Sequence, residues 1–421
     1  IACLETTMSP QVRVTHRPPN ATPLPYTASP LKLLGSDILL ALRYAWSLPL
    51  AFLPLRIGET GPLDELYPSL RSGVLVLTQL LSIVYQASFL LCLPIAIIFM
   101  VPAIWILVYV TVALLLSHVV CMVVLNGFQR LVVSQVPVPE QPDHIREKWF
   151  YINGIAGSRF WVQQNVDQLS YTFGRKITGI HNRTAGIIFD LLECLIQRCF
   201  SYATADIREA YPLVRDALLD PNCKKVVLIL HSQGGIEGGL VIDWLLDALP
   251  QNLLHNLEVY TFASAANHFN NPHTMQETKQ NGHDYPNNPP PSNRSVGYIE
   301  HYANIADIVS RIGVLHYVNI PNRYLGRLFV RVGSGHLLNQ HYLDAMFTLG
   351  PDRKVLESNQ FMDMEVETNF EKLPKHECEE TLLPISGIGD RSRNDQNHVQ
   401  ILRLKDFSRL WEYRNGQSPS D

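Results

Sequence analysis

The chain has 421 residues, of which 47% are hydrophobic and 17% charged, with a formal net charge of -4. This length predicts one large core plus an accessory region and excludes a disulfide-stapled mini-protein. Because 34 Lys and Arg face 38 Asp and Glu, the chain has no basic excess to neutralise phosphates, and a nucleic-acid partner is not expected. The seven cysteines form no CxxC pair, which indicates neither a disulfide framework nor a zinc site.

Residues 1–71 are expected to form an N-terminal region of two parts. Residues 1–30 are rich in Pro, Thr and Ser, a composition typical of disorder. Residues 31–55 mix Leu, Trp and Arg, which suits either an interfacial helix on a membrane or a segment packed on the hairpin that follows. Since the first residue is Ile1 rather than Met, a fragment or an incomplete gene model is expected, and the lack of a signal peptide carries no weight.

Residues 72–129 contain no Asp, Glu, Lys or Arg over 58 consecutive positions. A water-facing stretch of this length would carry about a dozen charges. Two transmembrane spans fit here, placed at Val74–Phe99 and Ala103–Leu125 with Pro94 and Pro102 as places to turn, whereas the alternative is a pair of buried helices in a soluble core. The neutral polar residues in the spans are expected at a helix contact or near an interface: Gln79, Gln86 and His118.

Arg71 and Arg130 bracket this hairpin, and two spans return the chain to the side from which it entered. Basic flanks favour a cytosolic catalytic region, and an integral membrane protein of an endomembrane is the expectation. Glycosylation sequons begin at Asn182 and Asn293 and would favour the lumenal side if modified, so the side stays open.

After a Pro-containing linker at residues 130–147, strand-like runs alternate with helical ones over residues 148–349. This alternation predicts a mostly parallel α/β sheet flanked by helices. Residues 350–421 mix both charges with little periodicity and are expected to form a partly ordered, charged tail. The predicted strands are Lys148–Ile152, Lys225–Leu230, Leu257–Phe262, Val296–Tyr302 and Leu328–Val332, and the predicted helices include Thr184–Phe200 and Ile236–Leu249.

The strongest chemical signal is the sequence His231-Ser232-Gln233-Gly234-Gly235, which joins the second of these strands to its helix. A serine on a sharp strand-to-helix turn is lifted clear of the sheet, and the crowded backbone requires small neighbours. The following helix also directs its N–H groups and positive dipole end at charge that develops there. The pattern predicts a nucleophile elbow with Ser232 as the nucleophile.

The chain here resembles the α/β-hydrolase superfamily and, within it, serine esterases and class 3 lipases. The resemblance covers about half the chain, roughly residues 148–347, and implies an α/β-hydrolase fold in which the nucleophile, the acid and the histidine follow in that order. Five segments carry it: Asn153–Gly157, His231–Gly235, Val259–Ser264 with Asn267 and Phe269, the turn at Asp307, and the loop ending at His336.

A serine needs a base to take its proton and an acid to hold that base in the correct tautomer. Asp307 follows a predicted strand, where its carboxylate would project from the C-terminal edge of the sheet. Its alternative role is a cap on a turn. Glu300 lies inside the strand and Asp284 in a Pro- and Asn-rich insertion, which makes both poorer candidates.

Two histidines compete for the role of base. His336 directly follows the last predicted strand, and His341 opens the next helix. We favour His336 and keep His341 as the alternative base, with the other serving a packing or capping role. His316, only nine residues after Asp307, is a distant third.

The oxyanion hole is expected to use the backbone N–H groups of Gln233 and Ile155, the latter from the Asn153–Gly157 loop. The side chain of Gln233 is a candidate substrate contact. The chain departs from the G-x-S-x-G pattern at Leu230, where a glycine is expected. Either the turn is slightly open there, or a neighbouring helix has a compensating small residue.

These roles imply acyl transfer through a covalent intermediate, with no metal or organic cofactor. A catalytic domain tethered close to a membrane predicts a lipase or esterase that acts on lipid or other apolar esters. The alternatives are an acyltransferase with the same triad and a catalytically inactive membrane scaffold, and a transporter or channel is disfavoured by the uncharged spans. The insertion Asn267–Ser295 is interpreted as a flexible loop rather than a lid, and the oligomeric state is left open.

Overall fold

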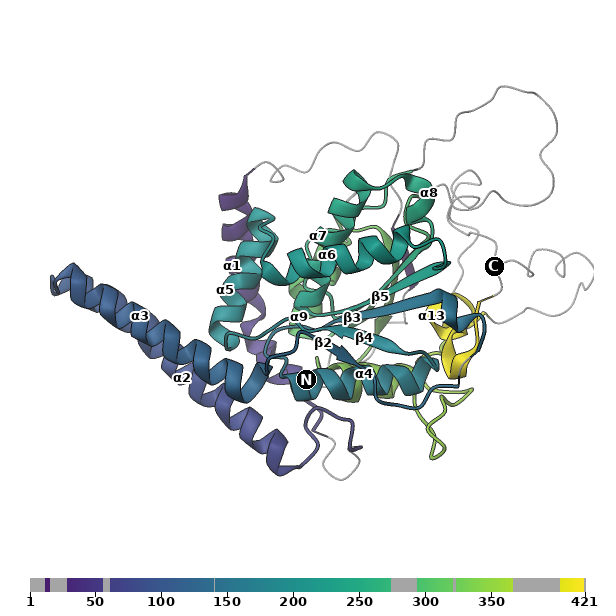
Figure 1. The fold of residues 1–421 in the computed structure, drawn as a ribbon, viewed down its shortest axis with the longest axis horizontal. Helices are drawn as coiled ribbons and strands as arrows, with labels where there is room; N and C mark the ends of the chain where they lie inside the picture. Colours follow the sequence, from purple (N-terminus) through teal and green to yellow (C-terminus); the bar gives the residue numbers. More distant parts are fainter. Residues whose placement is uncertain are drawn as a thin grey trace, which may run out of the picture.

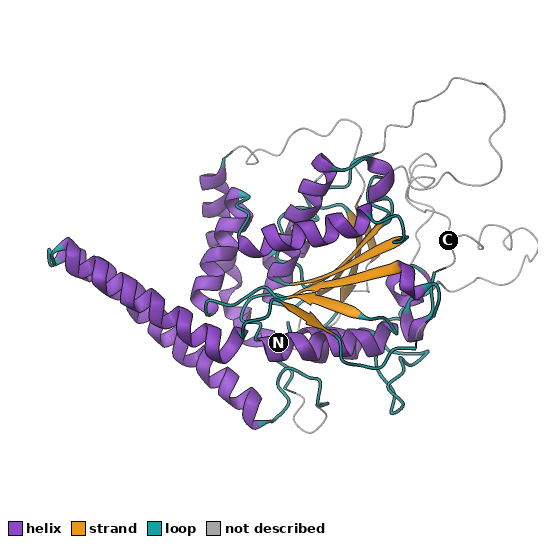
Figure 2. Ribbon diagram, in the orientation of Figure 1, coloured by secondary structure: helices purple, strands orange, loops and turns teal. Residues whose placement is uncertain are grey.

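The structure is a computed structural model that describes residues 12–15, 29–55, 61–139, 141–273, 294–320, 323–365 and 402–419. Most of the segment 1–30, most of the Asn267–Ser295 insertion, and Asp284 lie outside the described residues. The described chain forms one sheet with helices on both faces, and a helical hairpin projects from one side of it (Figure 1, Figure 2).

The sheet holds eight strands in the order β1-β8-β7-β6-β5-β3-β4-β2. The six central strands, β3 to β8, pair in parallel, while β1 and β2 pair antiparallel at the two edges. The predicted mostly parallel α/β sheet is confirmed, and all five predicted strands form within two residues of their expected ends. The strands are β1 Val12–Thr15, β2 Leu131–Val133, β3 Glu147–Ile152, β4 Ile177–Ile180, β5 Lys225–His231, β6 Leu257–Phe262, β7 Tyr298–Asn304 and β8 Gly326–Arg331.

Strand β5 is apolar on both faces, as expected for a central parallel strand. Leu228 and Leu230 join the core on one face, and Val227 and Ile229 join the core on the other. Helices α6 and α7 cover the first core, with α5 packed against α7, and α4 covers the second. The bounds of these helices are α4 Arg159–Phe173, α5 Ile187–Phe200, α6 Ala205–Leu219 and α7 Gln233–Ala248.

Several segments outside the predicted α/β region also contribute to it. Strand β1 pairs with β8 although its residues fall in the segment 1–30 that was expected to be disordered. Strand β2 lies within the expected linker. In the expected C-terminal tail, Leu404, Leu410 and Trp411 are buried in the same core as α4. The buried Glu300 carboxylate accepts the N–H groups of Arg409 and Leu410 at 2.9 and 3.2 Å, so it is a structural anchor. The described parts of the tail, residues 350–365 and 402–419, therefore pack on the domain.

The hairpin consists of α2 (Leu70–Ile98) and α3 (Ala103–Val120), which continues as a π-helical turn, η2 (Cys121–Asn126). Both helices are long and apolar enough to cross a membrane. The chain turns at Pro102, whereas Pro94 lies inside α2. Gln79 and Gln86 face the α/β domain and donate to the carbonyls of Ala156 and Ala185 at 3.2 and 2.6 Å.

The segment 31–55 forms helix α1 (Pro30–Tyr44) and a 3-10 helix, η1 (Ala45–Ala51). Helix α1 packs against α5 and α9 (Ile308–Ile312) of the α/β domain. Its main polar anchor is Asp37, which accepts two hydrogen bonds from the buried Arg198 guanidinium at 2.8 and 2.6 Å. The N-terminal segment is thus tied to the domain that carries the candidate site.

Candidate active site

Ser232 lies on a strained turn between β5 and α7. Its backbone has φ 58° and ψ -120°, a conformation that residues other than glycine rarely adopt. A Cβ at Gly234 would lie 2.4 Å from the carbonyl oxygen of Ile152, and one at Gly235 would lie 2.3 Å from Ser264 Oγ. Both glycines are therefore required by close approach of the neighbouring strands, and the turn has the geometry of a nucleophile elbow.

Leu230 occupies the position where a glycine was expected, and α7 makes room for it. Leu230 is fully buried, and a Cβ at Gly238 would lie 2.3 Å from its Cδ1 atom. The compensating small residue on a neighbouring helix is thus Gly238, which confirms the second of the two explanations for Leu230.

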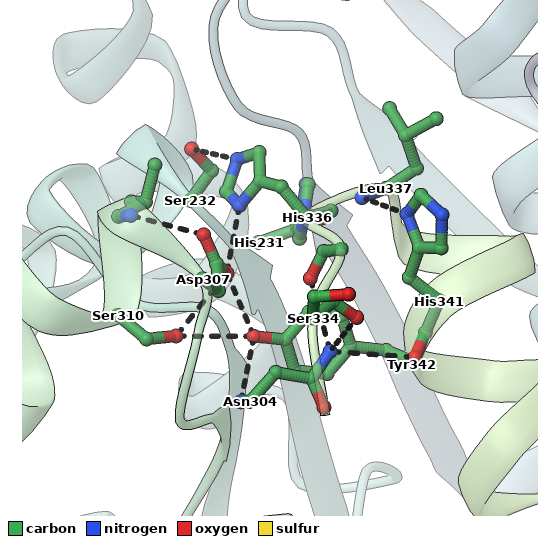
Figure 3. A network of polar contacts seen from close by, with 12 residues as sticks. His231, Ser232, Asn304, Asp307, Ser310, Ser334, His336, Leu337, His341 and Tyr342 are labelled. Carbon is green, nitrogen blue, oxygen red and sulfur yellow. Dashed lines mark hydrogen bonds and ion pairs between the residues drawn. The ribbon is translucent and has the colours of Figure 1, made fainter. Parts of the chain in front are cut away.

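Ser232, His336 and Asp307 form one hydrogen-bonded chain (Figure 3). His336 Nδ1 lies 3.0 Å from Asp307 Oδ2, and His336 Nε2 lies 3.0 Å from Ser232 Oγ. A carboxylate can only accept, so Nδ1–H donates to Asp307 and Nε2 accepts from the Ser232 hydroxyl. This is the arrangement that a general base and its orienting acid require.

Asp307 is fully buried at the N-terminus of α9 and is held by several donors. It accepts the N–H of Val309 at 2.9 Å and the hydroxyls of Tyr342 and Ser310 at 2.8 and 3.2 Å. Burial acts to raise the pKa of Asp307, but the adjacent His336 and these hydrogen bonds hold that pKa below its ordinary value. The carboxylate therefore stays ionised beside the imidazole.

The structure does not bring His341 to Ser232. His341 lies on the π-helical turn η4 (Leu338–Leu343), and its Nδ1 accepts the N–H of Leu337 at 3.1 Å (Figure 3). His316 lies on α10 (Val314–Tyr317), with its ring against that of Tyr317. Of the three candidate histidines, His336 is the one that contacts both Ser232 and Asp307.

The loop Asn153–Gly157 passes directly against the serine. A Cβ at Gly154 would lie 2.4 Å from Ser232 Cβ, so only glycine fits. Asp190 accepts the N–H of Ala156 at 2.9 Å and fixes the far end of the loop. Within the part of the chain that the structure describes, neither the N–H of Ile155 nor that of Gln233 donates a hydrogen bond.

The side chain of Gln233 is buried and already engaged. Its Oε1 accepts from Asn182 Nδ2 at 2.7 Å, and its Nε2 donates to Gln197 Oε1 at 3.0 Å. This amide holds α7 against its neighbours rather than facing a substrate. Asn182 is also buried, so its glycosylation sequon is inaccessible, and Asn293 lies outside the described residues.

A backbone strap from η1 holds the histidine loop, and sequence reasoning missed it. The carbonyls of Leu50 and Ala51 accept the N–H groups of Gly335 and His336 at 3.0 and 2.8 Å. Ser334 Oγ donates to the carbonyl of Leu53 at 2.8 Å. These contacts join residues more than 280 positions apart, and all but the Ser334 hydroxyl are backbone atoms, which leave no side-chain pattern to detect.

His231 was also missed as a partner of His336. Its Nε2–H donates to the His336 carbonyl at 2.8 Å, and the two rings lie 4.8 Å apart. Burial lowers the pKa of His231 to about 3, so the ring stays neutral and adds no charge beside His336. Its position in the elbow motif was the available signal.

Three carboxyl groups behind the elbow could hold a metal ion: Glu193, Asp206 and Glu237. Their ligand atoms lie within 4.8 Å of one another. Burial raises the pKa of all three, that of Glu193 to about 7. A raised pKa favours the neutral form of a carboxyl group, and Asp206 also lies 3.6 Å from the Arg130 guanidinium.

The chain matches no protein-family model, and no curated protein sequence is similar to it. The resemblance to α/β-hydrolases therefore rests on the motifs and on the geometry of Ser232, His336 and Asp307.

Proposed function

We propose that this protein is a membrane-embedded serine hydrolase of α/β-hydrolase type that cleaves the carboxylic ester bonds of lipids or of other apolar esters. The observation that carries the proposal is the continuous hydrogen-bonded chain from Ser232 through His336 to Asp307, placed on an elbow with φ 58° at the serine. A strained non-glycine residue held against its preference points to function rather than to folding.

In the proposed reaction, Ser232 Oγ attacks the ester carbonyl while His336 Nε2 takes its proton. The negative charge on the carbonyl oxygen is received by the N–H groups of Gln233 and Ile155, next to the positive end of α7. Asp307 keeps the imidazole in the required tautomer and stabilises its protonated form. His336 then protonates the leaving alcohol, and water releases the acid from the acyl-enzyme.

An acyltransferase with the same triad is the second candidate. The favouring observation is that Ser232 is only 2% exposed, which limits the access of water to an acyl-enzyme. A lipid alcohol that approaches from a membrane would then compete with water. The products separate the two reactions, since hydrolysis yields a free acid and transfer yields a new ester.

The test uses the full chain in lipid nanodiscs, with a soluble p-nitrophenyl ester and a diacyl lipid as substrates. S232A is expected to abolish release of acid and formation of new esters. The matched control is S201A, because Ser201 is the other serine with positive φ among the described residues but lies exposed at the end of α5. A folded wild-type protein that turns over neither substrate would refute the proposal and favour an inactive scaffold.

A further inference from the structure

Helix α5 is amphipathic in the reverse sense to a helix on a water-soluble protein. Its exposed residues are all apolar: Leu191, Leu192, Ile196 and Phe200. Its buried residues include the polar Asp190, Gln197 and Arg198. Water on the outer face would favour the opposite arrangement.

Helix α1 and η1 repeat this pattern beside α5. The one acidic residue of α1, Asp37, is buried against Arg198, whereas Leu39, Leu42 and Trp46 are exposed. The charged residues that α1 does expose, Lys32 and Arg43, are basic. An exposed apolar face with basic residues and no carboxylate suits the interface of a membrane. We call the exposed residues of α1, η1 and α5 the α1–α5 surface.

This surface is continuous with the hairpin. Helix α5 contacts both α1 and α2, and Gln86 of α2 accepts the N–H of Ile188 on α5 at 3.1 Å. In Figure 1, α1 and α5 stand side by side at the edge of the domain from which the hairpin leaves obliquely. A membrane that receives the hairpin therefore meets the α1–α5 surface as well.

Charged groups near the base of the hairpin limit the length of it that lipid hydrocarbon can surround. A cavity of about 390 Å³ is lined by His118 of α3 together with Arg130, Arg183 and Asp206. Charges at this level are costly in hydrocarbon. From His118, α3 runs 15 residues back to Ala103, or about 22 Å. From Gln86, whose side chain donates to the Ala185 carbonyl of the α/β domain, α2 runs 12 residues to Ile98, or about 18 Å. Both lengths are shorter than the hydrocarbon of a bilayer, which is about 30 Å thick. Oblique insertion reduces further the depth to which the helices extend.

The tip of the hairpin is built for hydrocarbon rather than for headgroups. Its turn residues Phe99, Met100 and Val101 are apolar and exposed. Their N–H groups donate to carbonyls of the last turn of α2: Phe99 to Ile95, Met100 to Ile97 and Val101 to Ala96, each at 3.0 Å. A turn with no charge and with its N–H groups paired costs much less to place in hydrocarbon than a charged turn or one with unpaired donors.

We propose that the hairpin does not cross the bilayer but embeds in it from one side, with the α1–α5 surface lying in the interface of the same leaflet. The chain is then monotopic, and its tip ends within the hydrocarbon. η1 runs from this interface directly to the strap on the His336 loop. If the proposed function holds, the candidate site therefore takes its ester from that leaflet.

Depth measurement by tryptophan quenching tests the embedding without any activity. Trp105 near the tip and Trp46 on η1 are matched probes, with exposed fractions of 64% and 62%. The full chain is placed in vesicles of phosphatidylcholine brominated either close to the headgroup or close to the chain end. The fluorescence of each tryptophan is taken as the difference between wild type and W105F or W46F. Trp244 on α7, measured with W244F, is the control expected to respond only to aqueous iodide.

The proposal predicts that Trp105 is quenched most by deep bromines and Trp46 most by shallow ones. Trp105 quenched by shallow bromines, and reached by iodide inside the vesicle, would mean a full crossing and overturn it. Trp46 quenched by iodide but by neither brominated lipid would place the α1–α5 surface in water. If neither iodide nor the brominated lipids quench Trp46, and this protection increases with the number of protein molecules per vesicle, a second copy of the chain covers this surface. Either result overturns the proposal.

A charge at the tip gives an independent test. Met100 and Leu70 are each 88% exposed. Leu70 is the first residue of α2, and Met100 lies two residues beyond its last one. M100K would carry a charge into hydrocarbon and is expected to weaken membrane partition about a hundredfold. L70K lies next to Arg71 and is expected to partition like wild type. Equal partition of M100K and wild type would show that the tip reaches the far headgroups.

Discussion

The fit between Leu230 and Gly238 makes a quantitative prediction about the elbow. In G238A, the new methyl group would lie 2.3 Å from Leu230 Cδ1 and 2.6 Å from Cδ2. The Cδ1 atom must retreat by about 1.2–1.7 Å to reach ordinary contact, although Leu230 is fully buried under α7. The substitution is therefore expected to weaken the fold at the base of the nucleophile turn.

The magnitude follows from two opposing effects. Overpacking of a filled core costs about 1–3 kcal/mol, and replacing glycine by alanine within a helix returns about 1 kcal/mol. We expect G238A to lower the free energy of unfolding by about 1 kcal/mol. L230A alone leaves a cavity and is expected to cost about 2–5 kcal/mol. In the double variant L230A/G238A the clash is absent, so the two substitutions should couple favourably by about 2 kcal/mol.

Denaturant unfolding of the detergent-solubilised chain measures all four free energies. The matched control is G239A on the same helix, where the new Cβ would meet only the carbonyl oxygen of His268 at 3.4 Å. G239A should leave the fold unchanged or slightly more stable. The reasoning is refuted if G238A is as stable as G239A, or if the free energies of L230A and G238A simply add.

Three further predictions concern individual carboxyl and imidazole groups. D307N puts an amide where His336 needs an acceptor, so kcat should fall about 10⁴-fold in the folded protein, and retention of most activity would contradict the role of Asp307. H341Q should keep kcat/KM close to wild type in the same ester assay, whereas a loss as large as that of H336Q would make His341 the base. Burial raises the pKa of Asp190 from 3.8 to about 6, so the unfolded chain releases this proton at lower pH than the folded one does. Stability should therefore fall by about 3 kcal/mol as pH rises from about 4 to about 6, and D190N should lack that fall in denaturant titrations; parallel pH profiles would contradict it.

The parts of the site that could be predicted from the sequence are those with a local signal. Strand β5 is an uninterrupted apolar run, and the elbow that follows it is five contiguous residues. Asp307 was proposed because it follows a predicted strand, and in the structure it lies three residues after β7, at the N-terminus of α9. Short strands gave no such signal: β4 is four residues long and contains Gly179, and β2 follows directly after the uncharged stretch.

Other features depend on contacts between distant segments. His336 could be favoured over His341 only narrowly, because both follow β8 within ten residues, and only the fold decides which ring reaches Ser232. Leu410 and Trp411 enter the core although charged residues surround them in the sequence. The role of Gly238 likewise required knowing that α7 packs over Leu230.

The central claim is that Ser232 is a nucleophile activated by His336 and Asp307, and covalent labelling tests it most directly. The full chain in nanodiscs is treated with a fluorophosphonate, digested, and the adduct is located by mass spectrometry. The account predicts one adduct, on the peptide that contains Ser232, which is absent in S232A and forms far more slowly in H336A. A folded wild-type protein that stays unlabelled, or an adduct that persists in S232A, would contradict it.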